Sequence, residues 1–280
     1  MSTSLLEMNH IKKEFDGLQV LKDVSIHVNE GEVVSIIGSS GSGKSTTMCV
    51  MIQELCNEQT NIMTLEDPVE YNIPGTNQCQ INEKTGMTFA AGLRSILRQD
   101  PDVISVGEIR DGETASIAVR AAITGHLVIS TLHTNDAVST ISRLVDIGVE
   151  PYMISSALRG VVSQRLVRKI CPQCRKAYTP TEEEKRMVGI AENEDVTFYK
   201  GEGCQECGRT GYRGRRGVFE ILTLDAALRR EVANNASSEE LTKTALENGF
   251  VTMKDNCRRL VLEGVTTVSE AAKAINSAAE

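Results

Sequence analysis

The 280-residue sequence has no long run of apolar side chains and no excess of positive charge. No apolar stretch approaches the roughly 20 residues that a membrane-spanning helix needs. The first fifteen residues also lack the apolar core of a secretory signal peptide. A net charge of −8 argues against a broad basic surface for DNA or anionic lipid. We therefore expect a cytoplasmic chain that binds no nucleic acid directly and meets a membrane only through partners.

Internal repeats and low-complexity tracts are absent as well. The apolar content of 40% and the charged content of 24% are those of an ordinary globular protein. The length allows one large core with a smaller appendage, or two modest domains. Eight cysteines in a cytoplasmic chain do not indicate a disulfide framework.

The most informative segment is the glycine-rich run GSSGSGKST, which directly follows the apolar segment 33–37. Its glycines allow a tight turn in which successive N–H groups point at one anion, and the next helix adds the positive end of its dipole. Lys44 can reach the β- and γ-phosphates of ATP, and the Ser45 hydroxyl can bind Mg²⁺. We predict a nucleotide site formed by Gly38, Ser39, Ser40, Gly41, Ser42, Gly43, Lys44, Ser45 and Thr46.

Apolar strands alternate with helical patterns through the first half of the chain, and this alternation predicts an α/β fold with a mostly parallel sheet. The strands read as continuous apolar runs, which indicates that both faces of the sheet are covered. The predicted strands are 11–15, 18–28, 33–37, 61–65, 103–106 and 127–132. The predicted helices are 45–55, 89–97, 114–123 and 137–147, with a long polar segment over 66–88.

Acidic residues follow two of the predicted strands. The cluster Glu66-Asp67-Pro68-Val69-Glu70 comes after strand 61–65, and Glu108 comes after strand 103–106. The carboxyl ends of parallel strands form the edge at which ligands bind. Acids there can hold Mg²⁺ or orient an attacking water, and Glu108 has the position of a Walker-B acid on the Mg²⁺ shell. For the 66–70 cluster, a solvated acidic turn is the alternative.

Two histidines bracket the strand 127–132. His133 lies at its carboxyl end, where it could hydrogen-bond a γ-phosphate, whereas His126 lies at the opposite end and is expected to be structural or at an interface. Oligomeric ATPases often complete a site with an arginine from the next subunit. Surface ion pairs are the alternative role for the three arginines that flank the predicted site, Arg94, Arg98 and Arg110.

Four of the eight cysteines form two Cys-x-x-Cys pairs, Cys171 with Cys174 and Cys204 with Cys207. Paired motifs of this kind predict a tetrahedral Cys₄ zinc site. Four thiolates leave no open coordination position, so we expect the metal to be structural. It would hold together a loop-rich module, residues 169–217, that has too few apolar residues to fold unaided.

The rest of the chain, residues 218–280, is predicted to be helical. Capping-box patterns begin at Ser237 and at Thr252, and Gly249 and Gly264 stand where helices would end.

Residues 46–280 resemble the ATPases of type II secretion and type IV pilus assembly. The matching segments are TLEDPVEYNIPGTNQCQIN, GLRSILRQDPDVISVGEIRDGETA, TGHLVISTLHTNDA and CPQC…GCQECGRTGYRGRRGVFEIL. The resemblance implies a RecA-like P-loop core, a zinc module and a helical C-terminal region. It makes Glu70 the general base or water-orienting acid, Glu108 the Mg²⁺-shell acid and His133 a phosphate sensor. It also implies a cytoplasmic homohexamer, peripheral at the inner membrane, whose ATP turnover drives a membrane platform protein.

Residues 1–45 resemble instead the opening of an ABC-transporter ATPase of the amino-acid-uptake type, in which Phe15 corresponds to an aromatic residue that stacks on adenine. We therefore expect a chimera of two families joined at the shared P-loop. Nothing after Thr47 resembles the rest of an ABC ATPase, and an LSGGQ-like signature is missing. The expected units are 1–45 (ABC-like strands), 46–168 (ATPase core), 169–217 (zinc module) and 218–280 (helical region).

Two alternatives to the secretion-type motor stay open. One is an ABC-transporter ATP-binding subunit, which the missing signature disfavours. The other is a docking or oligomerisation module whose hybrid site binds nucleotide poorly and does not hydrolyse it. The resemblance also leaves secretion, pilus and DNA-uptake roles undivided.

Overall fold

The computed structural model describes residues 4–15, 18–29, 33–38 and 41–276, and for residues 4–15 and 18–29 it describes the backbone alone. Seven described strands form one sheet in which neighbours are parallel, except for an antiparallel strand at one edge. The predicted α/β fold with a mostly parallel sheet is therefore confirmed. The strands are, in spatial order, β11 (Tyr212–Thr223), β8 (Leu158–Ile170), β3 (Val33–Ile37), β7 (Leu127–Leu132), β6 (Val103–Val106), β4 (Ile62–Glu66) and β5 (Asn77–Gln80).

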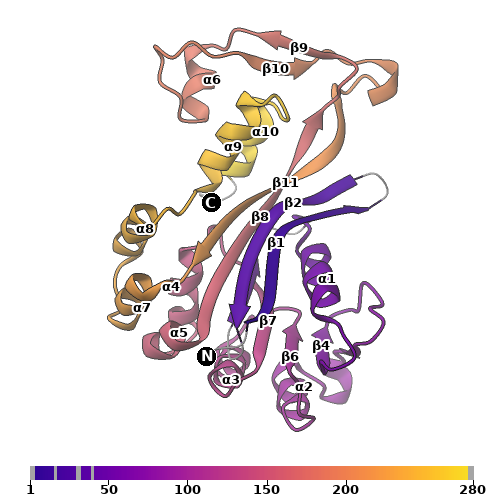
Figure 1. Ribbon diagram of the computed structural model, residues 1–280, viewed down its shortest axis with the longest axis vertical. Coiled ribbons are helices and arrows are strands. Elements are labelled where there is room, and N and C mark those ends of the chain that lie inside the picture. The colour runs from indigo at the N-terminus through magenta and orange to yellow at the C-terminus, as the bar shows by residue number, and fades with distance from the viewer. Residues whose placement is uncertain (1–3, 16–17, 30–32, 39–40, 277–280) are drawn as a thin grey trace.

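Helices cover both faces of this sheet (Figure 1). They are α1 (Lys44–Leu55), α2 (Phe89–Ile96), α3 (Gly112–Ile123), α4 (Ser139–Asp146) and α5 (Pro151–Ala157). In β3, Val34 and Ile36 pack with the buried side of α1. Val33 and Ile37 belong to the larger cluster on the other face, with α2, α3 and α5. This division follows from the two-residue period of a strand, and it explains why the whole strand is buried.

Most predicted elements lie where the sequence pattern puts them. Strands β6 and β7 have the predicted bounds. Helix α3 begins earlier than predicted because Asp111 caps it, its Oδ1 accepting the Thr114 N–H at 2.8 Å. The polar segment 66–88 is not a mere connection, since it contains the edge strand β5 and the short 3₁₀ helix η1 (Glu83–Thr85).

Strands β8 and β11 continue from the sheet to the cysteine-bearing part of the chain (Figure 1). The elements of this part and of the C-terminal region are β9 (Arg175–Tyr178), α6 (Glu182–Met187), β10 (Phe198–Gly201), η2 (Gln205–Cys207), α7 (Ala226–Ala233), α8 (Ser238–Glu247), α9 (Met253–Leu262) and α10 (Val268–Asn276). The predicted capping box at Ser237 is present, and Gly249 and Gly264 take positive φ just after α8 and α9. Thr252 caps α9 by accepting the Asp255 N–H.

The helical region predicted from residue 218 is confirmed but begins later, because residues 218–223 continue β11. Val218, Glu220 and Leu222 are buried on one side of the strand, and the strand pairs with β8 as far as Thr223. As a result, the expected limits after residues 168 and 217 both fall inside continuous strands.

The first two predicted strands, 11–15 and 18–28, belong to a separate antiparallel hairpin, β1 (Ser4–Phe15) and β2 (Leu18–Asn29). The hairpin lies beside the main sheet, and β2 runs near β11 (Figure 1). This hairpin therefore lies beside the main sheet and forms no strand pairing with the seven strands described there.

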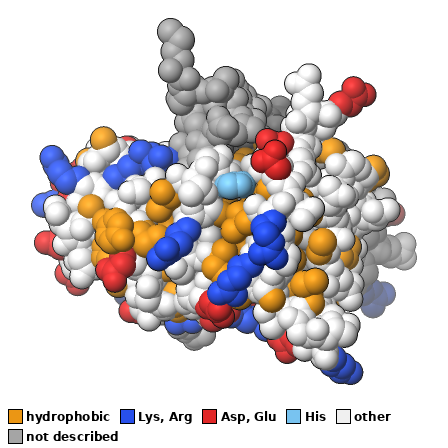
Figure 2. Space-filling view, turned by 90° about the horizontal axis from the view of Figure 1, so that it is seen from below, with side chains coloured by type: hydrophobic (Ala, Val, Ile, Leu, Met, Phe, Trp, Pro, Cys, Tyr) orange, Lys and Arg blue, Asp and Glu red, His pale blue; other side chains and the backbone are white. Residues whose placement is uncertain are grey.

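No helix in the described ranges is both long enough and apolar enough to cross a bilayer. Figure 2 shows the face seen from below, where Lys and Arg side chains are interspersed with acidic and hydrophobic ones. Exposed hydrophobic side chains of the molecule include Ile123 on α3 and Tyr152 on α5. The described side chains on the face of Figure 2 thus form a mixed surface rather than a patch of one charge.

Helix α10 is anchored to β8 by one nearly buried carboxylate. Glu270 accepts hydrogen bonds from the Arg168 guanidinium at 2.8 Å, from Lys273 Nζ at 3.1 Å and from the Arg168 backbone N–H at 3.2 Å. The hydrogen bond from the Arg168 side chain is the main cause that lowers the pKa of Glu270 to about 2. The Arg168 guanidinium also stacks on the Tyr212 ring at 4.0 Å. The C-terminal helix is therefore held by an ionised group.

We expect Glu270→Gln to lower the free energy of unfolding at neutral pH by about 1–3 kcal/mol, as for a hydrogen bond to a charged group. The pKa of Glu270 is lower in the folded chain than its ordinary value of 4.5. Its stabilisation is therefore complete above that value and is lost as the pH falls toward 2. Urea unfolding at pH 7 and pH 3 should show a smaller difference between wild type and variant at pH 3.

The matched control for this experiment is Glu247→Gln, which changes an exposed carboxylate on α8. It should leave stability nearly unchanged at both pH values. An equal effect of Glu270→Gln at pH 7 and pH 3 would contradict the anchoring role of the ionised group.

Candidate functional site

A cleft of about 540 Å³ opens at the carboxyl ends of the central parallel strands. The P-loop follows β3, the acidic segment follows β4, Glu108 follows β6 and His133 follows β7. All of these segments contribute to the walls of the cleft. The parallel sheet thus brings together four groups that are far apart in the sequence, as ligand sites in such sheets require.

The described part of the P-loop has the geometry expected of an anion-binding loop. Gly41 and Gly43 take φ of 77° and 88°, and Gly43 is the N-cap of α1. The Lys44 ammonium donates to the Gly38 carbonyl. Burial, and then the charge of Arg165, lower the pKa of Lys44, while Glu108 opposes them. Ser39 and Ser40 lie outside the described residues.

Glu108 is the electrostatic centre of the cleft. Its side chain is only 14% exposed, and it forms an ion pair with Arg110 and contacts the imidazole of His133. The His133 Nε2 atom lies 3.0 Å from the Glu108 Oε2 atom. A carboxylate with so little access to water needs such partners, and the arrangement places an acid, an imidazole and a guanidinium within one hydrogen-bonded group.

The acidic segment after β4 contributes two carboxylates to the cleft, Glu66 and Glu70. Glu66 is fixed by hydrogen bonds, because its Oε1 accepts from Thr64 Oγ1 at 2.6 Å and from Gln78 Nε2 at 2.9 Å. Glu70 is exposed and lines the open side. The hydroxyls of Tyr71 and Thr46, 3.3 Å apart, join this segment to the start of α1.

The three arginines predicted near the site have different surroundings. Arg110 is in the cleft's hydrogen-bonded group through Glu108. Arg94, on α2, pairs with Glu113 of α3 at 2.6 Å and does not line the cleft. Arg98, just after α2, does not line it either. Within one chain only Arg110 therefore joins the predicted catalytic groups.

Two other predicted residues lie at element ends. Phe15 is the last residue of β1, and its side chain lies outside the described part of the structure. His126 directly precedes β7, and its Nδ1 atom lies 2.9 Å from the carbonyl oxygen of Ala121 in α3. This contact agrees with the structural role expected of His126.

Sequence reasoning missed the contribution of β8 and β11 to this region. Leu166 of β8 and Arg215 of β11 line the cleft beside the P-loop. Gln164 and Arg165 of β8 hold the loops around it. The only sequence signal for this contribution is the polar pair Gln164-Arg165 inside a largely apolar strand. The pair does not by itself identify the residues that it contacts.

The loop that follows His133 is fastened from the strands β8 and β11. The Arg165 guanidinium donates to the Asn135 carbonyl at 2.9 Å. The buried Glu220 carboxylate accepts the Ala137 N–H at 2.8 Å and the Met253 N–H, at the start of α9, also at 2.8 Å. Burial raises the pKa of Glu220, and these two N–H donors oppose the shift. One carboxylate thus joins the cleft-side loop to the C-terminal helices.

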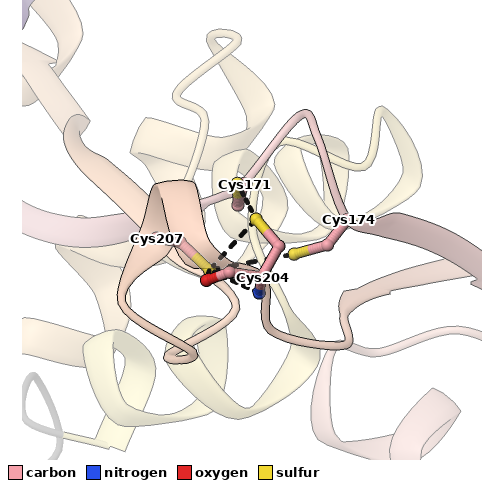
Figure 3. Close-up of side chains that lie close together, drawn as sticks. All are labelled: Cys171, Cys174, Cys204 and Cys207. Atoms are coloured by element: carbon pink, nitrogen blue, oxygen red, sulfur yellow. Dashed lines mark hydrogen bonds between the residues drawn. The ribbon is translucent and has the colours of Figure 1, made fainter.

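The four paired cysteines converge as their spacing predicted (Figure 3), and their sulfur atoms all lie within 4.8 Å of one another. Cys171 Sγ lies 3.8 Å from Cys204 Sγ, and Cys174 Sγ lies 3.9 Å from Cys207 Sγ. A tetrahedral zinc ion with Zn–S bonds of about 2.3 Å has sulfur–sulfur distances of about 3.8 Å. The cluster therefore fits a tetrahedral metal ion such as zinc.

Backbone donors favour a thiolate within this cluster. The N–H of Cys204, at 3.2 Å, and the N–H of Gly211, at 3.3 Å, both point at the Cys207 sulfur. The Cys204 N–H is the largest cause that lowers the pKa of Cys207 to about 6. Metal ions bind the thiolate form, so this sulfur is prepared for coordination by the fold itself.

Comparison with known proteins places nearly all of the chain in one group. The family model described as "Type II/IV secretion system protein" matches residues 5–273. The chain is 48% identical over 250 residues to the type II secretion system protein E of Pseudomonas aeruginosa, covering 89% of this chain and 49% of that protein. It is 48% identical over 237 residues to the type IV pilus assembly ATPase PilB of Thermus thermophilus, covering 84% of this chain and 27% of that protein.

The fold is also similar to a solved structure, that of the pilus retraction motor PilT with bound ADP. The TM-score is 0.63 at 32% identity, over 88% of this chain and 61% of the other. The chain spans about half or less of the length of these two curated relatives.

The family match begins at residue 5 and runs across the join expected at Thr46, so it gives no support to an ABC-transporter segment or to a chimera. The P-loop, the strand-end acids, His133 and the four-cysteine cluster all fall within the matched range. The chain belongs to the type II/IV secretion system protein family.

Proposed function

We propose that this chain is a P-loop ATPase whose ATP turnover drives type II protein secretion or type IV pilus assembly. The observation that carries the proposal is the convergence of Lys44, Glu108 and His133 on one cleft at the strand ends. The functions of the relatives support it, since one acts in type II secretion and another in pilus assembly. The bound ADP of the similar retraction motor supports a nucleotide as the ligand.

In this proposal the P-loop binds the phosphates of ATP. The backbone N–H groups along residues 38–46, including Ser39 and Ser40, surround the phosphates, and the helix dipole of α1 adds positive potential. The Lys44 ammonium leaves the Gly38 carbonyl and binds the β- and γ-phosphates. The Ser45 hydroxyl and Glu108 are the protein groups that hold Mg²⁺, which would neutralise phosphate charge when bound.

The remaining cleft groups act on the attacking water and the γ-phosphate. Glu70, on the open side, orients the water and accepts its proton. His133 hydrogen-bonds the γ-phosphate and senses its loss through Glu108. Arg110 stabilises the charge that develops as the phosphate leaves. Arg94 and Arg98, which do not line this cleft, serve the site of the next subunit.

A further part of the proposal concerns a bound metal. The four cysteines hold one structural Zn²⁺, and their sulfur–sulfur distances are the support for that metal. In that role the ion closes the long excursion between β8 and β11, whose buried side chains Val188, Ile190 and Phe198 pack against the C-terminal helices.

The assembly we propose is a homohexameric ring in the cytoplasm, peripheral at the inner membrane through a platform protein. The alternative of a docking module without turnover differs from the motor in one measurable property, hydrolysis.

We expect Mg²⁺-dependent ATP hydrolysis by the purified chain, and we expect it to fall about 10²–10⁴-fold in Glu70→Gln, as for loss of a general base. Lys44→Ala should also abolish turnover, because it removes the phosphate-binding cation. Phosphate release by a coupled assay measures both. Lys243→Ala, an exposed lysine on α8, is the control and should retain wild-type turnover. A folded wild type without turnover would refute the motor and leave the docking module.

We expect about one zinc ion per chain if all four thiolates bind one metal. Elemental analysis of reduced protein should show this stoichiometry, and Cys171→Ser should lower it. Limited proteolysis should then cut the segment 171–211 faster while the ATPase core stays protected. The control is Cys79→Ser, which changes a cysteine on β5 outside the cluster. A folded, reduced chain without zinc would overturn this assignment.

A further inference from the structure

A fully buried amide, Gln164, stands in the middle of β8 next to the P-loop strand. Its exposed fraction is 0%. β3 pairs in parallel with β8, with Ile37 opposite Ser163, so the next residue of β8 is level with the first glycine of the P-loop. A buried side-chain amide is costly unless its donors and acceptor are satisfied. The buried Gln164 amide therefore needs hydrogen-bond partners within the protein.

Both ends of the amide bind the phosphate-binding segment. The Gln164 Nε2 donates to the Ser42 carbonyl at 2.8 Å, and the Gln164 Oε1 accepts from the Thr47 hydroxyl at 2.7 Å. One contact is in the glycine-rich loop and the other is in the first turn of α1. The side chain thus bridges the two parts of the P-loop that must keep a fixed mutual position.

The P-loop glycines also pack against this residue. A Cβ atom at Gly43 would lie 3.0 Å from the side-chain amide nitrogen of Gln164. A Cβ atom at Gly38 would lie 2.5 Å from the backbone carbonyl oxygen of Gln164. Gly38 and Gly43 therefore let the loop approach β8 this closely, and they also allow the turn of the loop.

The hydrogen bond to Ser42 has a consequence for phosphate binding. In a planar trans peptide the C=O and the following N–H point in opposite directions. When Gln164 fixes the Ser42 carbonyl on the β8 side, the Gly43 N–H points to the opposite side. Backbone N–H groups of such loops are the phosphate ligands, so Gln164 sets the direction of one of them.

We propose that Gln164 is a positioning residue for phosphate binding, one that touches no ligand and acts by holding Ser42 and Thr47. The inference rests on the proposed function of this cleft as a nucleotide site. A residue with a merely structural role would change the stability of the chain. A positioning residue also changes the affinity of the folded chain for phosphate-bearing ligands.

The test measures Mg²⁺–ADP binding to the full chain by isothermal titration calorimetry, at a temperature where each variant is folded. Gln164→Met keeps the length of the side chain and removes both hydrogen bonds. We expect it to weaken ADP binding about tenfold or more, because a buried carbonyl left unpaired costs enough for such a change. Ser163→Ala is the matched control on the same strand, since its buried hydroxyl has no hydrogen-bond partner among the described residues.

Substitutions at Thr47 test the same contact from the other side. Thr47→Val removes the hydroxyl with little change of shape and should weaken ADP binding several-fold, whereas Thr47→Ser keeps the hydroxyl and should bind as wild type does. The double variant Thr47→Val/Gln164→Met should bind more tightly than the two single losses multiplied would predict, since both break one contact. If Gln164→Met does not fold, the Thr47 pair alone decides the matter.

The outcomes separate this inference from the proposed function. A wild type that binds no ADP would overturn both. A wild type that binds ADP, beside a folded Gln164→Met with wild-type affinity, would overturn the positioning role alone. Equal losses in Thr47→Val and Thr47→Ser would do the same. Weaker ADP binding in Gln164→Met and in Thr47→Val, with wild-type affinity in Thr47→Ser, would establish the positioning role of Gln164.

Discussion

The cleft depends on the parallel pairing of the four central strands. Because β3, β7, β6 and β4 run in one direction, the groups that follow them leave the sheet at one edge. Their register is fixed by apolar side chains that take no part in chemistry. A shift of one residue in β3 would turn Val34 and Ile36 away from α1 and toward the opposite face. The hydrophobic period therefore holds the polar groups in place.

At this edge of the sheet, Glu108 would compete with a bound anion for the cationic side chains of the cleft. The carboxylate is mostly withdrawn from water, its charge is compensated by Arg110, and it also raises the pKa of Lys44 against the effect of burial. A buried acid left without such partners would be costly. A polyanion entering the cleft attracts the same cations that Glu108 holds. Under the proposed function, a bound nucleotide would compete with Glu108 for these side chains, and the freed carboxylate would be available to hold Mg²⁺.

The parts that could be predicted from the sequence are those encoded in short segments. The P-loop with its helix, the strand before Glu108 and the strand before His133 each show a pattern within about a dozen residues, and each lies where it was predicted. Contacts across the chain carry no such signal. Gln164 meets Thr47 117 residues away, and Glu220 meets Ala137 83 residues away. The end of β11 was also misjudged, because a short apolar run fits a helix or a strand equally well until its pairing partner is known.

Strand β8 also gives the molecule a mechanical element. It is a single unbroken strand of 13 residues, and Gln164 and Arg165 in its middle hold the loops on the two sides of the cleft. Cys171 follows its last residue, about 20 Å beyond Arg165 at the rise of an extended chain. Pairing with β11 stiffens the part between. β8 therefore connects the loops at the cleft to the cysteine cluster through one continuous strand that is paired on both sides.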